Sequence, residues 1–325
     1  MVPLNTLRRV TGVQSVIPLY HAVSDAVPAH LKYLYPVRDT KAFEKDLDFL
    51  CRHYKPVSLE ELILLHKEGR LFSKKVFHLT FDDGLREFGE VTAPILKRKG
   101  IPATCFLNEG FIDNKHMFFR FKASILIDKL HYSPEGSETW KSYHEWAKQH
   151  QAGKNYYRKA LLNIDYAQSE TLDELAHLLQ LDFAEYLKTH KPYLTNQEIK
   201  SLIKDGFTFG AHSSDHPKYS DISLDKQVKT TLESIAAINS EFSLNYKVFT
   251  FPFTDDQVSL EYFNRTAEKL DLSFGCAGVK FDSVPSNLQR LPVESYKYEI
   301  RDSLKKELLY FAFLSVLNKQ TIKRG

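Results

Sequence analysis

Short apolar segments rich in β-branched and aromatic residues alternate with amphipathic segments along most of the chain. The apolar segments predict strands over residues 15–23, 76–81, 103–107, 208–211, 247–253 and 272–276. The clearest amphipathic segments predict helices over residues 86–99, 196–205, 224–242 and 259–270. Strands that alternate with helices form βαβ units and a parallel sheet. About seven such units fit one α/β domain, a distorted (β/α) barrel, whose chemistry gathers at the carboxyl ends of the strands.

Polar and glycine residues mark the ends of several predicted helices. Asp39 and Ser58 stand directly before amphipathic segments, where a short polar side chain can accept a hydrogen bond from a free backbone N–H group. Gly100 follows the helix expected at residues 86–99, and glycine commonly takes the left-handed conformation that closes a helix. These signals agree with the helices that hydrophobic periodicity predicts.

Two segments depart from the alternation. Residues 113–195 are helical in pattern, charged and aromatic-rich, and we expect a helical insertion there within a single domain of residues 1–325, as a lid or substrate-recognition element. Residues 300–325 are expected to form a C-terminal helix, whose apolar run at 308–317 is too short to span a bilayer. We expect this helix to pack on the body of the domain. Contact with a membrane surface is the less favoured alternative, based on the flanking residues Lys305, Lys306, Lys319 and Lys323.

Composition and charge narrow the classes of function. Hydrophobic residues make up 43% and charged residues 26%, which is typical of a globular protein. Because 44 basic residues nearly balance 41 acidic ones and no long basic run occurs, we expect no nucleic-acid partner. Cys51, Cys105 and Cys276 form no CxxC pair, which argues against a thiolate zinc site. Two arginines interrupt the N-terminal segment where a signal peptide needs apolar residues, so we expect a cytoplasmic location.

The sequence Thr-Phe-Asp-Asp-Gly ends the strand expected at residues 76–81. Its two carboxylates, Asp82 and Asp83, repel each other unless a cation or a shared proton relieves the repulsion. Gly84 lets the backbone turn sharply after them. A metal ion would resolve the conflict by binding one carboxylate and leaving the other as a base. Asp and Gly also favour ordinary turns, which is the alternative interpretation.

The sequence His-Ser-Ser-Asp-His follows the strand expected at residues 208–211. Its imidazoles, His212 and His216, can bind one cation if the backbone between them turns, and a solvated loop is the alternative. Two histidines and one carboxylate form an arrangement used for zinc or iron that leaves positions open for water and substrate. Because both motifs follow strands of one predicted sheet, they predict a divalent metal site, with zinc as the first choice.

The two motifs resemble the first two motifs of the polysaccharide deacetylase family, also called the NodB-homology or carbohydrate esterase 4 family. The segment Leu-Tyr-His-Ala-Val at residues 19–23 is similar to the tyrosine-histidine segment near the start of many members. The likeness covers roughly residues 15–112 and 196–295. It implies a distorted (β/α) barrel of the NodB-homology type. It also implies a general base and three metal ligands, which correspond to Asp82 and to Asp83, His212 and His216.

The chain departs from the family pattern at two motifs. The third family motif, Arg-x-Pro, supplies an arginine that braces the catalytic aspartate, but the segment at residues 250–253 reads Thr-Phe-Pro-Phe. Arg290 is the candidate replacement, and an ordinary surface arginine is the alternative. The fifth motif, Leu-x-His, supplies the general acid, but no histidine follows His216. His21, at the end of the first strand, is the candidate acid, and a core histidine is the alternative.

The motifs and the resemblance predict a metal-dependent hydrolase that removes acetyl groups from N-acetylated sugars of a polysaccharide or its precursor. Asp82 would accept the proton of the attacking water, and His21 would protonate the departing amine. Two alternatives are a hydrolase of another amide or ester, and a catalytically impaired glycan-binding relative that serves surface-polysaccharide assembly. In each case the expected partner is a carbohydrate, and the sequence indicates no oligomeric state.

Overall fold

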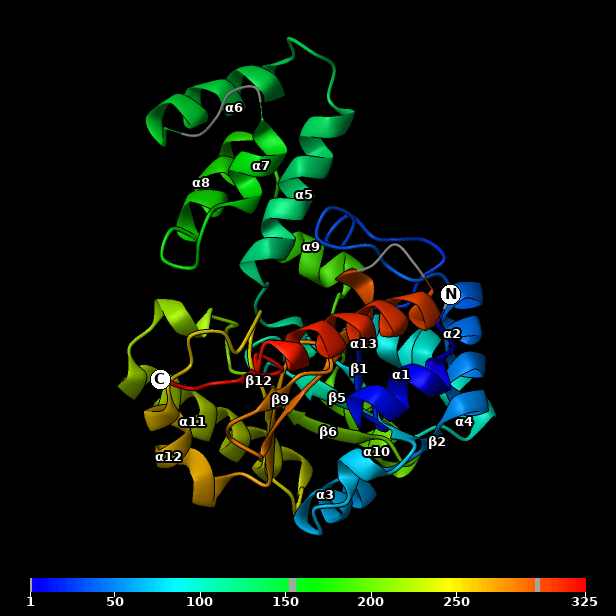
Figure 1. Cartoon of the computed structure of the whole chain (residues 1–325). Coiled ribbons are helices and arrows are strands. Elements are labelled where there is room, and N and C mark those ends of the chain that lie inside the picture. The colour runs from blue at the N-terminus through cyan, green and yellow to red at the C-terminus, as the bar shows by residue number, and fades with distance from the viewer. Residues whose placement is uncertain (1, 152–155, 296–298) are drawn as a thin grey trace.

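A parallel sheet forms the centre of the computed structural model, which describes residues 2–151, 156–295 and 299–325. Eight strands follow one another in the order β10-β8-β7-β6-β5-β4-β1-β11. Figure 1 labels β1, β5 and β6 of this sheet. Because β10 and β11 are separated only by Arg290, the two edges of the sheet belong to one stretch of chain, and the sheet nearly closes. The predicted distorted (β/α) barrel is therefore confirmed. The strands are β1 (Pro18–Tyr20), β4 (Leu79–Phe81), β5 (Ala103–Leu107), β6 (Thr208–Ala211), β7 (Val248–Thr250), β8 (Leu272–Gly275), β10 (Asn287–Gln289) and β11 (Leu291–Pro292).

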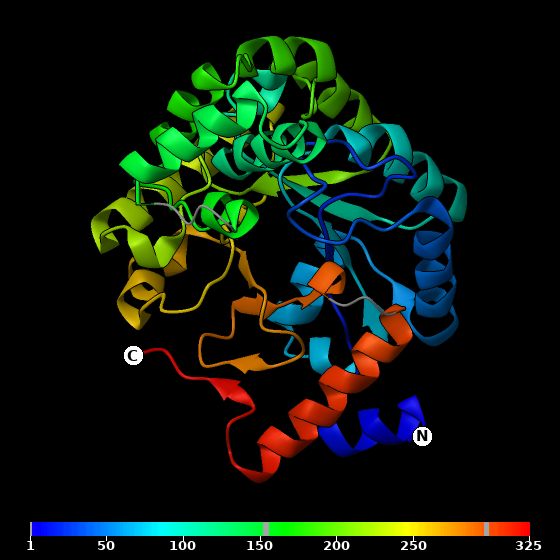
Figure 2. The ribbon, with the colours of Figure 1, turned by 90° about the horizontal axis from the view of Figure 1, so that it is seen from above.

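Helices surround the barrel, as the view from above shows (Figure 2). The capping signals are confirmed, since Asp39 and Ser58 accept hydrogen bonds from the first turns of α2 and α3, and Gly100 closes α4 with φ 65°. The apolar faces of the helices and the strands share one large core. The helices are α1 (Leu4–Thr11), α2 (Thr40–His53), α3 (Leu59–Lys67), α4 (Ala93–Lys99), α10 (Asn196–Lys204), α11 (Leu224–Phe242), α12 (Leu260–Thr266) and α13 (Ile300–Val316).

Further helices, from the segment between β5 and β6, stand above the barrel in Figure 1. They are α5 (Phe119–Tyr132), α6 (Glu138–Gln149), α7 (Tyr157–Leu162), α8 (Glu170–Leu178) and α9 (Phe183–His190). A second apolar core holds them together, with Tyr143, Trp146 and Leu175 among its fully buried members. The start of α5 lies above the carboxyl ends of the barrel strands (Figure 1), so this segment is placed where it can contact a substrate. The division of the chain into one domain with an insertion stays a prediction.

Three predicted strands are shorter or divided in the structure. Residues 15–23 form a strand only over β1, and residues 247–253 only over β7. Residues 76–81 form β3 (Val76–Phe77), which pairs with β2 (Lys55–Pro56) outside the barrel, and β4 inside it. The chain changes partner at His78, whose buried ring donates a hydrogen bond to the carbonyl of Val57 and accepts one from the hydroxyl of Thr104. Hydrophobic patterning alone therefore predicted one strand where long-range hydrogen bonds make two.

One predicted helix differs in its interior and another in its end. The helix predicted at residues 86–99 starts at residue 86 as expected but contains a π-helical turn, Phe88–Thr92, directly before α4. Pro94 has no N–H group for an ordinary helical bond and so favours the wider turn. The C-terminal helix predicted to reach residue 325 ends at Val316, since Asn318 takes the left-handed conformation with φ 56°. The chain then forms β12 (Thr321–Ile322), which pairs with β9 (Phe281–Asp282).

The two sides of α13 differ in burial. Leu304, Leu308 and Phe311 are buried in the core, so the helix packs on the body of the molecule as the favoured prediction had it. Phe313 and Val316 face outward and are 61% and 82% exposed. Across the described part of the chain, no helix combines the length and the apolar character needed to cross a membrane.

Candidate metal and catalytic site

The candidate site residues lie at the carboxyl ends of barrel strands. Asp82 and Asp83 directly follow β4, His212 directly follows β6, and His21 directly follows β1. Arg290 lies between β10 and β11, where the barrel closes. Parallel strands end at the same rim of a barrel, so residues that are far apart in the sequence can meet there.

Three side chains converge as a metal site would require. Oδ1 of Asp83 lies 3.5 Å from Nε2 of His212 and 3.3 Å from Nε2 of His216. One ligand atom from each of the three residues lies within 4.8 Å of the others, and all three residues are buried. The structure therefore brings together the ligand set that the two sequence motifs predicted.

The hydrogen bonds of these side chains fit a cation. Nδ1–H of His212 donates to the carbonyl oxygen of Thr250 over 2.9 Å, which fixes the tautomer with a lone pair on Nε2, the atom that faces Asp83. Oδ1 of Asp83 is buried and has no hydrogen-bond partner among the described residues. A buried carboxylate oxygen without a partner is costly, and a cation in contact with it would remove that cost. The donor set of two imidazoles and one carboxylate suits zinc.

The backbone at this site takes unusual conformations. Asp83, Ser213 and His216 have φ values of 71°, 63° and 60°, in the left-handed region that non-glycine residues rarely adopt. Gly84 has φ 61°, and a Cβ atom there would lie 2.7 Å from Cδ2 of Leu107. Such conformations persist only where the surrounding structure enforces them, and they cluster at functional sites. Here they turn the ligand side chains toward one point.

Asp82 is held by Arg290 rather than by the metal ligands. Two guanidinium nitrogens of Arg290 donate to Oδ1 and Oδ2 of Asp82 over 2.7 Å and 2.8 Å, and both side chains are almost fully buried. Arg290 also donates to the carbonyl of Gly275 and to the hydroxyl of Thr250. Burial raises the pKa of Asp82, but Arg290 and His212 more than offset this and hold the pKa below its usual value. Asp82 is therefore an ionised, firmly oriented carboxylate.

His21 pairs with a glutamate that the sequence motifs did not single out. Nδ1 of His21 lies 2.6 Å from Oε2 of Glu294, and the backbone N–H groups of His21 and Ala22 donate to Oε1 of the same side chain. Burial lowers the pKa of His21, but Glu294, Asp83 and Asp82 outweigh it and raise the pKa to about 9. His21 is therefore protonated at neutral pH, with Nδ1–H bound to Glu294.

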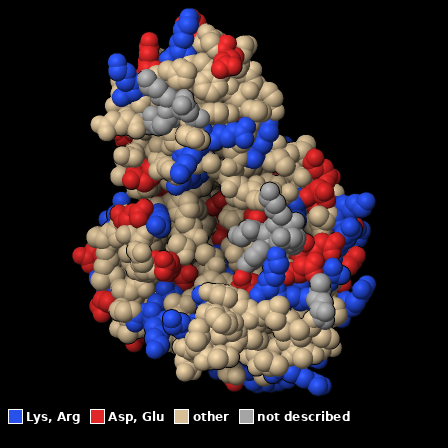
Figure 3. Space-filling view, turned by 45° about the horizontal axis from the view of Figure 1, so that its top comes forward, with Lys and Arg blue, Asp and Glu red and all other residues tan. Residues whose placement is uncertain are grey.

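These groups open into one cavity of about 730 Å³. Figure 3 shows the surface hollowed between the helical segment above and the barrel below. The side chains that line the cavity include catalytic candidates, apolar residues and one arginine from α5. They are His21, Leu34, Tyr35, Asp82, Asp83, Phe118, Arg120, Leu162, His212, His216, Phe253, Cys276 and Glu294. The mixture of apolar walls and a few polar groups is typical of a small-molecule site.

A family model described as polysaccharide deacetylase matches residues 70–275, which is more than half of the chain. The chain belongs to the polysaccharide deacetylase family. The resemblance seen in the sequence motifs is thereby confirmed, and family membership supports a hydrolase that acts on an acetylated carbohydrate. The matched residues contain both motifs but neither His21 nor Arg290, so the roles of these two residues rest on geometry.

Solved structures of deacetylases share the fold of this family member. PplD from Streptococcus pyogenes, in complex with acetate, is 16% identical with a TM-score of 0.56, over 91% of this chain and 98% of that one. IcaB from Ammonifex degensii is 14% identical with a TM-score of 0.54, over 91% and 96%. A de-N-acetylase from Aggregatibacter actinomycetemcomitans is 14% identical with a TM-score of 0.54, over 89% and 99%. At these identities the likeness concerns the fold alone. No curated protein sequence matches this chain.

Sequence reasoning missed several residues of the deacetylase cavity. Glu294 stands four residues after Arg290 in the same segment, but no motif marks it as the partner of His21. Tyr35 stacks on the ring of His21 at 4.6 Å, and its buried hydroxyl has no hydrogen-bond partner in the described parts of the chain. The ring centres of Phe253 and His216 are 4.7 Å apart, and the backbone of Phe253 has φ 59°, a strained value for an aromatic residue. Pro252, inside the strand predicted at residues 247–253, was the one local signal for such a turn.

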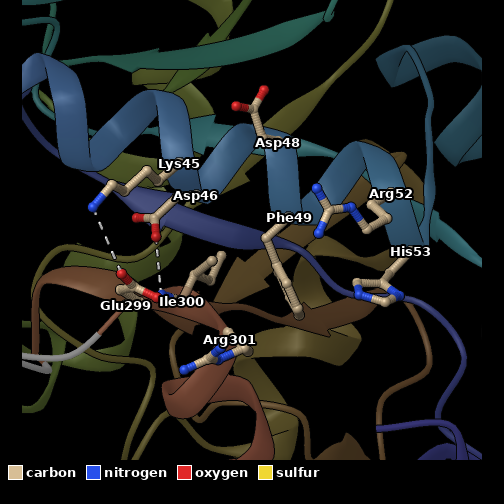
Figure 4. A pocket seen from close by; sticks show the side chains of 9 residues that line it. All are labelled: Lys45, Asp46, Asp48, Phe49, Arg52, His53, Glu299, Ile300 and Arg301. Carbon is tan, nitrogen blue, oxygen red and sulfur yellow. Dashed lines mark hydrogen bonds and ion pairs between the residues drawn. The ribbon is translucent and has the colours of Figure 1, made fainter.

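A second cavity, of about 470 Å³, lies between α2 and α13, away from the strand ends (Figure 4). Some of its charged side chains pair within the cavity, whereas Asp48 pairs with Lys99 and Arg301 with Asp302 outside it. Asp46 accepts a hydrogen bond from the backbone N–H of Ile300, and Lys45 lies 4.0 Å from Glu299. The described residues that line this cavity include none of the site residues that the motifs predict.

Proposed function

We propose that this chain is a metal-dependent deacetylase that hydrolyses the acetamido group of an N-acetylated sugar, in a polysaccharide or in its precursor. The convergence of Asp83, His212 and His216 beside the ionised Asp82 carries the proposal. The first three residues would hold the metal, and zinc is the first choice because its catalytic sites combine such ligands with an open position. When bound, the ion supplies Lewis-acid polarisation of the acetyl carbonyl and a lowered pKa for water.

Asp82 would serve as the general base. An ionised carboxylate within reach of the attacking water can accept its proton as the water adds to the acetyl carbon. Arg290 takes one lone pair of each Asp82 oxygen and leaves the others for water, and it fixes the plane of the carboxylate. Arg290 is thus proposed as a positioning residue that acts through Asp82.

His21 would serve as the general acid. In the metal-free protein its pKa of about 9 corresponds to a protonated imidazolium at neutral pH, and Glu294 pairs with that charge. The side chain lines the cavity with 26% of its surface exposed. Because Glu294 binds Nδ1, the proton available to a substrate is the one on Nε2. Transfer of that proton to the departing nitrogen would release a free amino sugar and acetate.

Metal content and acetate release, measured together, test this proposal. We expect close to one zinc per chain by elemental mass spectrometry, and acetate release from N-acetylated oligosaccharides. Asp82→Asn should keep the metal and lose the activity, because the base is not a ligand. Asp83→Asn and the double variant His212→Ala/His216→Ala should lose both the metal and the activity.

A matched control removes two other histidines. The double variant His144→Ala/His177→Ala changes exposed residues of α6 and α8 and should keep both metal and activity. Failure of the wild-type protein to bind zinc, or full activity of Asp82→Asn, would contradict the proposal. Acetate release from O-acetylated sugars alone would favour an esterase. Glycan binding without metal or hydrolysis would favour an impaired relative.

A further inference from the structure

A single arginine from the segment above the barrel faces the proposed active site. Arg120 stands in the first turn of α5 and lines the same cavity as Asp82, Asp83 and His21. Its side chain is half-buried. Its guanidinium carbon lies 4.9 Å from the ring centre of Phe119 and 5.7 Å from that of Phe253. Arg120 is therefore held over two aromatic rings at the wall of the cavity.

Burial lowers the pKa of Arg120, and the carboxylate of Asp165 attracts its charge and offsets part of that effect without pairing with the guanidinium. Among the described residues, its side chain makes no hydrogen bond and no ion pair. The other cations at the cavity are paired, since Arg290 binds Asp82 and His21 binds Glu294. Rings on which a guanidinium stacks leave its N–H donors available in the plane of the group. A half-buried arginine without an acceptor is thus suited to bind an acceptor that the substrate brings.

The position of Arg120 limits where on the substrate this acceptor can lie. The ring of Phe253 approaches both the guanidinium of Arg120 and the ring of His216, at 5.7 Å and 4.7 Å between centres. These two distances place the guanidinium carbon no more than about 10 Å from the ring centre of His216. One sugar ring and a group attached to it can span such a gap, so an acceptor for Arg120 can belong to the sugar that carries the acetamido group, or to a group attached directly to it.

The chemistry of amino sugars identifies this acceptor. In a 2-acetamido sugar the carbons next to C2 are C1 and C3. C1 bears phosphate, bonded directly to O1, in activated and carrier-linked sugars, whereas the lactyl carboxylate that C3 bears in N-acetylmuramic acid lies further from the ring. The carboxylate of a uronic acid lies across the ring from C2. Inside a neutral glycan, O1 forms a glycosidic bond and has no charge. Arginine binds phosphate through paired N–H···O bonds.

We propose that Arg120 forms a phosphate subsite, and that the substrate is an N-acetylated glycosyl phosphate rather than a neutral glycan. This inference rests on the proposed deacetylase function and specifies its substrate class. The phosphate could belong to a nucleotide-linked or a lipid-linked sugar, which share the same group at C1. Arg120 would set binding and not chemistry, because it contacts neither Asp82 nor the metal ligands.

Steady-state acetate release from a matched pair of probes tests the subsite. N-acetylglucosamine 1-phosphate and N-acetylglucosamine differ only in the phosphate. We expect the zinc-loaded wild type to prefer the phosphorylated sugar. Arg120→Ala should raise KM for that sugar by about 10- to 100-fold, because the free energy of a hydrogen bond to a charged group corresponds to a factor of this size. It should leave kcat, and KM for the neutral sugar, within about threefold. Arg120→Lys keeps the charge but loses the planar guanidinium, so its KM for the phosphorylated sugar should lie between those of the wild type and Arg120→Ala.

A control on the same helix separates a local from a general charge effect. Lys129→Ala removes one positive charge from an exposed position of α5 and should change neither KM. An equal increase in KM for both sugars in Arg120→Ala would overturn the phosphate assignment. So would a wild type that shows no preference between them.

A binding measurement keeps this inference separate from the proposed function. In the Asp82→Asn background no turnover is expected, and calorimetry can compare the affinities of the two sugars. Tighter binding of the phosphorylated sugar that disappears with Arg120→Ala would support the subsite, even if the wild type released no acetate. Equal affinities would overturn it. Comparison of UDP-N-acetylglucosamine with a prenyl diphosphate-linked sugar in detergent would then distinguish the two sources of the phosphate.

Discussion

The ion pair between Arg290 and Asp82 gives the sharpest test of how this site is built. The two side chains are 1% and 4% exposed and are joined by two hydrogen bonds of 2.7 Å and 2.8 Å. Arg290→Met keeps an unbranched side chain of similar length but removes the charge. Asp82 would then remain in the barrel as a buried carboxylate without its cation, and the bonds to Gly275 and Thr250 would also be lost.

The expected loss of stability follows from this burial. Removing one partner of a buried ion pair costs about 3–5 kcal/mol, because the other charge is left uncompensated. In the double variant Arg290→Met/Asp82→Asn neither charge remains, so the loss should be smaller than the sum of the single losses. The difference, the coupling energy, should be about 0.5–3 kcal/mol.

Equilibrium unfolding in urea, with chelator present so that no metal stabilises the fold, measures these losses. The pKa of Asp82 is lowered in the folded state, so its ionised form stabilises the protein above the unfolded pKa of about 4, and this contribution fades as the pH falls. The cost of Arg290→Met should therefore shrink below pH 4. A cost under about 1 kcal/mol at pH 7, or one independent of pH, would refute the reasoning.

Three further predictions concern the rest of the molecule. The pKa of His21 is raised to about 9 from an ordinary 6.5, so its contribution to stability is complete below pH 6.5 and is lost as the pH rises through 9. Metal-free protein should thus melt at lower temperature at pH 9.5 than at pH 7, and His21→Gln should reduce this difference. Gly84→Ala should destabilise the fold by more than about 1 kcal/mol, measured by urea unfolding, because the residue has φ 61° and an added Cβ would clash with Leu107. On α13, Leu308→Ala should cost about 2–5 kcal/mol, whereas Phe313→Ala, 61% exposed, should stay within about 0.5 kcal/mol; equal effects would contradict the described packing.

The order of strands and helices could be predicted from the sequence because it depends on local patterns. Periodicity marked six of the eight barrel strands but neither β10 nor β11. Asp39, Ser58 and Gly100 marked helix ends through bonds within one turn. The ends of the strands could not be predicted in this way. The break at His78 depends on hydrogen bonds to Val57 and Thr104, which only the folded sheet brings near.

The helix errors also have a physical cause. The last helix was predicted over residues 300–325. The helix ends at Val316 because Asn318 takes a left-handed backbone conformation and the following residues form β12, which pairs with β9. The residue pattern within one segment does not indicate whether a distant segment will present an unpaired strand edge beside it.

The sequence by itself determined the family, the barrel and the four residues of the two motifs. Asp82, Asp83, His212 and His216 are fixed by short segments at strand ends, and strand ends of a parallel barrel meet at one rim. Arg290 and His21 were candidates by elimination, since the motifs that usually hold an arginine and a histidine lack them.

The tertiary structure decided what surrounds those four residues. The closure of the barrel at Arg290 places its guanidinium on Asp82, the last turn after β11 places Glu294 on His21, and the start of α5 places Arg120 in the cavity. Each of these contacts joins segments that are far apart in the sequence. Such contacts depend on how the folded segments pack together and not on the residues adjacent in the sequence. Local motifs therefore supply the proposed metal ligands and the proposed base. The ion pairs around them and the proposed substrate subsite depend on contacts between segments that are distant in the sequence.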